Sequence, residues 1–75
     1  MSNPRAVRLG LVGAGPWGQK LIAALARDPT IELRAVASRN PATRSLVSKD
    51  CAVTADWRAL ARDPGIQGVV IATPP

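Results

Sequence analysis

The feature that most constrains the fold of this chain is a glycine-rich turn set between two segments of different hydrophobic period. Residues 13–18 read GAGPWG and fit the pattern G-x-G-x-x-G. Before the turn, Val7 to Val12 is an apolar run typical of a strand. After it, Pro16 to Arg27 has the spacing of an amphipathic helix. A glycine turn in this context indicates the first strand–turn–helix unit of a parallel α/β sheet.

The rest of the chain continues the alternation of short apolar runs with helix-like stretches. We expect strands at residues 7–12, 31–37, 52–54 and 68–72, and helices at 16–27, 42–49 and 56–62. Asn40 and Asp56 are expected helix N-caps, and Pro41 suits the first position of the second helix. Residues 69–72 are apolar without alternation, which predicts a strand covered on both faces.

Strand–helix alternation at this spacing predicts βαβ units and a parallel sheet. Right-handed crossovers and the usual doubly wound order place the strands, numbered along the chain, in the order 3-2-1-4. We therefore predict an α/β fold, with residues 1–75 forming the N-terminal part of a Rossmann domain. The order of the sheet reverses between the first and fourth strands, so Gly13 and Thr73 should be neighbours at the carboxyl edge, where ligands bind.

Composition limits the kinds of partner and site that we expect. The formal charge of +5 on 75 residues suggests a nucleic-acid partner, but the arginines are scattered and Phe and Tyr are absent, so none is predicted. Cys51 is the single cysteine and histidine is absent, which leaves no disulfide within the chain and no metal site. No apolar run approaches the roughly 20 residues of a membrane span. A signal-peptide pattern is also missing, and we expect a cytoplasmic protein with no membrane partner.

Each glycine of the turn has a separate expected role in holding a phosphate group. Gly13 permits the tight turn, Gly15 lets the backbone approach a pyrophosphate, and Gly18 lets the helix pack closely. Pro16 begins the helix, whose N-terminus directs free N–H groups and a partial positive charge at the anion. Trp17 lies near the mouth of the turn, either as a partly exposed packing residue or as a contact of the ligand. The alternative for the whole motif is a glycine-rich turn without a ligand.

The end of the second predicted strand indicates which dinucleotide is bound. Domains that bind NAD place an Asp or Glu about 20 residues after the third glycine, where it accepts from the ribose 2′-hydroxyl. Here that position is Ser38, followed by Arg39 and Asn40, with Arg44 one turn further along. A hydroxyl and a guanidinium would bind a 2′-phosphate that a carboxylate would repel. We predict NADP as the cofactor rather than NAD; the alternative is that Arg39 and Arg44 are solvated surface residues.

With these residues in place, the chain resembles the N-terminal part of the glucose–fructose oxidoreductase/inositol dehydrogenase family, often written Gfo/Idh/MocA. The resemblance runs from Arg8 to Pro75. It rests on LVGAG at 11–15, IELRAVA at 31–37, DWRAL at 56–60 with DP at 63–64, and VVIATPP at 69–75. The family pattern implies that Thr73 and Pro74 line the cofactor near its nicotinamide half. Many members carry Asp at the position of Ser38, so the choice of cofactor rests on the local residues.

The resemblance implies an oxidoreductase that transfers hydride between NADP(H) and a sugar, polyol or related substrate. The family's catalytic lysine lies in a Glu-Lys-Pro segment, and neither Lys20 nor Lys49 sits in one, so no catalytic residue is assigned. We expect the rest of the Rossmann domain and a substrate domain to lie outside these residues. The 75-residue chain alone should be inactive, and the whole protein should be a homo-oligomer.

Two alternatives remain open from the sequence. The chain could belong to a non-catalytic sensor that binds a dinucleotide as a ligand, since fold does not fix function. It could also belong to a different Rossmann enzyme, which would share the glycine turn but would not require the Thr73-Pro74 ending. A Glu-Lys-Pro segment further along the chain would favour the enzyme over the sensor.

Overall fold

The computed structural model describes residues 5–72, and these form four parallel strands connected by three helices. The strands lie in the order β3-β2-β1-β4, which confirms the predicted partial Rossmann fold. The strands are β1 (Val7–Val12), β2 (Ile31–Ala37), β3 (Ala52–Thr54) and β4 (Gly68–Ile71), and the helices are α1 (Pro16–Ala26), α2 (Thr43–Leu46) and α3 (Arg58–Arg62).

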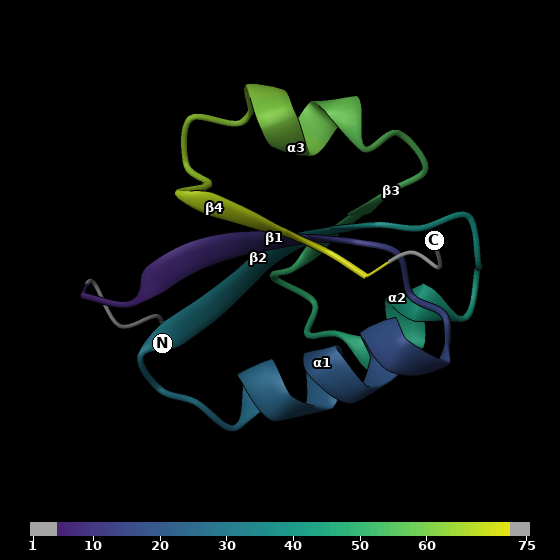
Figure 1. Ribbon diagram of the computed structural model, residues 1–75, viewed down its shortest axis with the longest axis horizontal. Helices are drawn as coiled ribbons and strands as arrows, with labels where there is room; N and C mark the ends of the chain where they lie inside the picture. Colours follow the sequence, from purple (N-terminus) through teal and green to yellow (C-terminus); the bar gives the residue numbers. More distant parts are fainter. Residues whose placement is uncertain (1–4, 73–75) are drawn as a thin grey trace.

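The helices cover the two faces of the sheet unequally. Helices α1 and α2 lie on one face and α3 lies alone on the other (Figure 1). The larger core cluster forms on the α1 face around Leu11, Ile22 and Val36. On the α3 face, Leu60 packs with Ala35 and Ala37. Small residues suit this second face because they let the short helix α3 approach the strands closely.

A β-bulge divides β2 into two segments. Leu33 pairs with Leu9, but the next residue of β1, Gly10, pairs with Ala35, so Arg34 is an extra residue in β2. Leu33 lies in the cluster on the α1 face, whereas Ala35 lies in the cluster on the α3 face. The extra residue therefore reverses which side chains of β2 face α1. Leu33 faces α1 before the bulge, and Val36 faces it after the bulge. The Arg34 side chain forms an ion pair with Asp63, with 3.2 Å between Nε and Oδ2.

All three helices are shorter than the sequence suggests, α1 by only one residue. Helix α2 was expected over residues 42–49 and spans only Thr43–Leu46, with Ala42 rather than Asn40 as its N-cap. Asn40 instead closes a local turn, because its Oδ1 accepts from the Ala42 N–H at 3.0 Å. Likewise, Asp56 Oδ1 accepts from the Arg58 N–H at 3.0 Å, and α3 begins at Arg58. Side chains that bond the backbone two residues ahead favour such turns over continued helix.

The prediction that β4 is covered on both faces is wrong for the α3 face. Val70 packs in the larger core cluster on the α1 face. Its neighbours Val69 and Ile71 point to the opposite face, where 44% and 72% of their surface is exposed. The reason is that α3 is only five residues long and packs mainly against β2.

Candidate functional site

The glycine turn between β1 and α1 has the geometry that its sequence predicts. Gly13 has a φ of +99°, a left-handed conformation that side chains rarely adopt. Its N–H donates to the Ala37 carbonyl at 2.9 Å, which fixes the turn to the end of β2. Gly18 is buried, and a Cβ there would lie 2.4 Å from the Gly13 carbonyl oxygen. Close packing of α1 on its own loop therefore requires Gly18.

Gly15 is different, because the fold itself does not require a glycine there. Its φ of −71° suits any residue, and a Cβ at Gly15 would meet no atom within 4 Å. The space beside Gly15 is open to a ligand that approaches the backbone. Pro16 occupies the first turn of α1, and no side chain caps that end of the helix. The free N–H groups and the helix dipole at this end favour an anion such as a phosphate.

The carboxyl ends of β1 and β2 and the segment that follows β3 meet at a shallow groove of about 220 Å³. Its lining includes Gly13 from the glycine turn, Ser38 and Arg39 from the end of β2, and Trp57 from the start of α3. The Ser38 N–H donates to the Thr54 carbonyl at 2.7 Å, which ties the end of β2 to that of β3. The groove thus lies at the edge of the sheet where α/β proteins bind their ligands.

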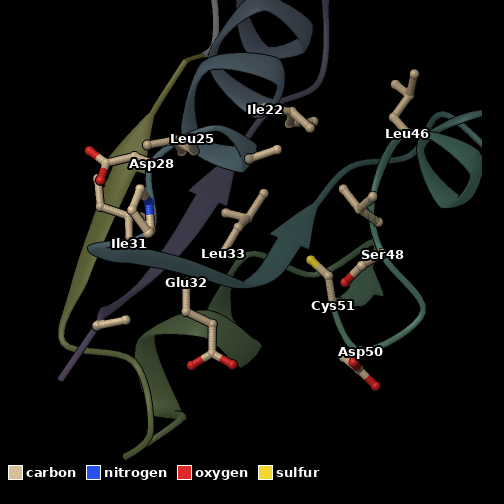
Figure 2. Close-up of a pocket in the computed structure, with 14 residues that line it drawn as sticks. Ile22, Leu25, Asp28, Ile31, Glu32, Leu33, Leu46, Ser48, Asp50 and Cys51 are labelled. Carbon is tan, nitrogen blue, oxygen red and sulfur yellow. The ribbon is translucent and has the colours of Figure 1, made fainter. Parts of the chain in front are cut away.

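A second, larger cavity of about 460 Å³ lies at the opposite edge of the sheet, where the strands begin. Figure 2 shows Ile22, Leu25 and Leu33 pointing into it from α1 and β2, while Glu32 points to the other face of β2. We place the site at the smaller groove because the glycine turn and the strand ends meet there.

The two residues that follow β2 differ in their contacts. The Ser38 hydroxyl is hydrogen-bonded, whereas the Arg39 guanidinium has no partner among residues 5–72. Ser38 is half-buried, and its Oγ accepts from the Asn40 N–H at 3.1 Å. Arg39 is exposed, and its side chain forms no hydrogen bond or ion pair with any residue from 5 to 72. No carboxylate is among the described residues that line this groove. Its electrostatics therefore favour an anion over a neutral hydroxyl group.

The structure gives Arg44 a different environment from that of Arg39. Its guanidinium donates to the Cys51 carbonyl at 2.8 Å and to the Ser48 carbonyl. These bonds hold the α2–β3 loop, and Arg44 does not line the groove. Trp17 is 62% exposed and also lies outside the groove lining. The predicted contacts at Thr73 and Pro74 lie outside the described residues.

Trp57 lines the groove, and reasoning from the sequence did not include it. The side chain is 55% exposed, and the Arg58 guanidinium carbon lies 5.7 Å from the centre of its ring. The signal was available, since Trp57 follows the third predicted strand by three residues and the ends of parallel strands share one edge. An exposed aromatic ring at this place offers a flat surface to a planar group such as a nucleobase.

The single thiol lies away from the groove, and no metal centre is found among residues 5–72. Burial raises the pKa of the Cys51 thiol, against the opposing effect of Arg44, and the thiol lines the distant larger cavity. No group of three or more His, Cys, Asp or Glu side chains in this part of the chain is placed to hold a metal ion. The described groups of the groove can bind and orient a ligand.

A parallel sheet with a glycine turn after β1 and a polar groove after β2 defines a dinucleotide-binding Rossmann domain. Residues 7–75 match the Gfo/Idh/MocA model, described as an oxidoreductase family with an NAD-binding Rossmann fold, and the chain belongs to this family. Within the described residues, no helix is long and apolar enough to cross a membrane.

Solved structures share this fold over nearly the whole chain. A proposed oxidoreductase from Magnetospirillum magnetotacticum is 43% identical, with a TM-score of 0.84 over 93% of this chain and 23% of its own. A proposed NADPH-dependent oxidoreductase from Desulfitobacterium hafniense is 24% identical, with a TM-score of 0.77 over 96% of this chain and 21% of its own. D-galactose-1-dehydrogenase from Rhizobium etli is 22% identical, with a TM-score of 0.75 over 100% of this chain and 23% of its own.

The chain thus spans about a quarter of the length of these structures. Among curated proteins, no sequence matches the chain significantly.

Proposed function

We propose that this chain binds NADP(H), as the cofactor-binding portion of an oxidoreductase that acts on a sugar, polyol or related alcohol. The observation that carries the choice of NADP(H) is the groove at the end of β2, where Ser38 and Arg39 stand and no carboxylate is among the described lining residues. A 2′-phosphate carries negative charge, which the unbound guanidinium of Arg39 would neutralise. The sugar or polyol substrate is inferred from the family, whose named members act on hexoses and on a cyclic polyol.

The described residues offer places for the pyrophosphate and the adenosine half of a dinucleotide at the carboxyl ends of β1, β2 and β3. The open space at Gly15 and the uncapped start of α1 would take the pyrophosphate. Ser38 and Arg39 would take the 2′-phosphate, and the exposed ring of Trp57 would lie beside the adenine. These groups bind and orient the cofactor, while a bound nicotinamide would supply the hydride-transfer chemistry. No proton-transfer step is assigned to any residue of this chain.

The test is the ratio of dissociation constants for NADP and NAD, measured by calorimetry on the full-length protein that carries this chain. We expect wild type to prefer NADP and Arg39→Ala to weaken NADP binding by about 10- to 150-fold, since hydrogen bonds to charged groups contribute roughly 1.5–3 kcal/mol. NAD binding should be almost unchanged. Ser38→Asp should reverse the preference, because it adds repulsion of the phosphate and an acceptor for a 2′-hydroxyl.

Arg44→Ala is the matched control, because it removes the same charge from a side chain that lies outside the groove lining and already binds two carbonyls. This substitution should leave the ratio of the NADP and NAD dissociation constants at the wild-type value. A wild-type preference for NAD, or an unchanged ratio in Arg39→Ala, would show that the groove does not select the 2′-phosphate.

The substrate is tested separately, with hexoses, cyclic and acyclic polyols and simple alcohols supplied to the full-length protein together with NADP. Formation of NADPH is followed by its absorbance. Turnover with a sugar or polyol and none with simple alcohols is the expected result. Cofactor binding without turnover of any alcohol would favour the non-catalytic sensor.

A further inference from the structure

The hydroxyl group of Thr43 lies behind the groove and is fully buried. Thr43 is 0% exposed, and it is the only polar residue in the buried set of the described chain. Its N–H donates to the Asn40 carbonyl at 3.0 Å, and its Oγ1 lies 2.9 Å from Ser38 Oγ. No other acceptor for the Thr43 proton is found among residues 5–72, whereas the half-buried Ser38 can donate into the groove, so we assign Thr43 as the donor of this bond. Because burying a hydroxyl is favourable only when it is hydrogen-bonded, the bond to Ser38 fixes the orientation of both side chains.

Ser38 Oγ receives a second hydrogen bond, from the N–H of Asn40 at 3.1 Å. A serine hydroxyl has two acceptor lone pairs and one proton. The bonds from Thr43 and Asn40 occupy both lone pairs, and no acceptor for the Ser38 proton is found among residues 5–72. Ser38 therefore faces the groove as a hydrogen-bond donor. Accepting two bonds also polarises its O–H group and strengthens it as a donor.

We infer that Thr43 is a positioning residue for the choice of cofactor, because it holds Ser38 as a donor and withdraws it as an acceptor. This inference rests on the proposed function. A phosphate oxygen offers only acceptors, and it carries charge, so it matches such a donor well. A ribose 2′-hydroxyl in the same place could not donate a hydrogen bond to Ser38, because both lone pairs of Ser38 Oγ already accept one. Discrimination between NADP and NAD would thus come from the buried Thr43 as well as from the exposed Arg39.

The experiment compares Thr43→Val with Thr43→Ser in the full-length protein, by the NADP and NAD dissociation constants and the melting temperature. Valine keeps the shape and loses the hydroxyl, whereas serine keeps the hydroxyl and loses a buried methyl group. We expect Thr43→Val to lower the preference for NADP by about 2- to 13-fold, the equivalent of one hydrogen bond. Thr43→Ser should keep the wild-type preference even where its melting temperature falls.

A purely structural role for Thr43 would give the opposite pattern, in which both cofactors weaken together and the loss follows the melting temperature. Ser38→Ala provides the second arm. If Thr43 acts through Ser38, adding Thr43→Val to Ser38→Ala should change the ratio no further.

Each outcome has one meaning. An unchanged ratio in Thr43→Val, with wild type preferring NADP, overturns this inference and leaves the proposed function standing. Additive effects of Thr43→Val and Ser38→Ala also overturn it. A wild-type protein that binds neither dinucleotide, or that prefers NAD, overturns the proposed function and this inference with it.

Discussion

Substituting alanine at Gly15 and at Gly18 should separate ligand binding from folding within one turn. At Gly18, an added Cβ would lie 2.4 Å from the carbonyl oxygen of Gly13 and 3.0 Å from its carbon. Contacts of a Cβ with other atoms essentially never fall below 3.0 Å, so the helix or the turn must move by at least 0.6 Å (3.0 minus 2.4). Gly13 cannot yield easily, because its φ is +99° and its N–H is bonded to Ala37.

Overpacking of this kind costs about 1–3 kcal/mol. In a domain of 150–250 residues, each kcal/mol shifts the melting temperature by roughly 2–4 °C, so Gly18→Ala should lower it by about 2–12 °C. Gly15→Ala should leave it unchanged or raise it slightly, since its φ of −71° suits alanine and no atom lies within 4 Å. The methyl group of Gly15→Ala would instead occupy the space for the pyrophosphate. The same overpacking range corresponds to about 5- to 150-fold weaker binding of NADP.

The assay is thermal unfolding of the full-length protein without ligand, followed by calorimetric titration of each variant with NADP. Wild type and both variants are compared at equal protein concentration, because association would shift the melting temperature. The reasoning is refuted if Gly15→Ala melts as early as Gly18→Ala. It is also refuted if Gly15→Ala binds NADP as tightly as wild type.

Three further predictions follow from the contacts described above. Arg44→Ala should lower the free energy of unfolding by about 1 kcal/mol, measured by urea unfolding, because it frees two loop carbonyls; an unchanged value would show that these bonds contribute nothing. The hydrogen bond from the Gly65 N–H, and then the Arg34 guanidinium, hold the pKa of Asp63 below its usual 3.8. The ionised carboxylate therefore stabilises the fold above pH 3.8, and this stabilisation is lost as the pH falls through the lower pKa of the folded state. In Asp63→Asn, the melting temperature should therefore fall less steeply with decreasing pH than it does in wild type. An equally steep fall would contradict this. The 75-residue chain alone should reduce no NADP and should self-associate through β4, whose Val69 and Ile71 are exposed; a monomer in sedimentation would contradict the association.

The sequence predicted the strands almost completely, because their apolar runs are short and end at turn residues. The bounds of β1, β2 and β3 agree with the prediction, and β4 ends one residue earlier, at Ile71. The order of the strands also followed from general rules of handedness. These features depend on local patterns and on topology, which a single sequence contains.

The helix lengths and the partners of charged side chains were harder to predict. Asn40 and Asp56 are common both as helix caps and in turns, and only the folded backbone decides which role applies. Arg39 and Arg44 are chemically identical in the sequence, yet one is unbound in the groove and the other binds the carbonyls of the α2–β3 loop. Trp57 follows β3 at the edge that the strand ends share, so the topology indicated its place, but only the folded structure shows that it lines the groove.

The bulge at Arg34 gives β2 one residue more than regular pairing with β1 requires. Gly10 pairs with Ala35 because Arg34 is an extra residue, and every residue after it is displaced by one position. Deleting Arg34 would join Leu33 directly to Ala35 in regular pairing, so Ser38 and Arg39 would keep their places at the end of the strand. The loss of one residue at the bulge can therefore be accommodated during divergence without exchanging Ser38 and Arg39, the two residues proposed to face the cofactor.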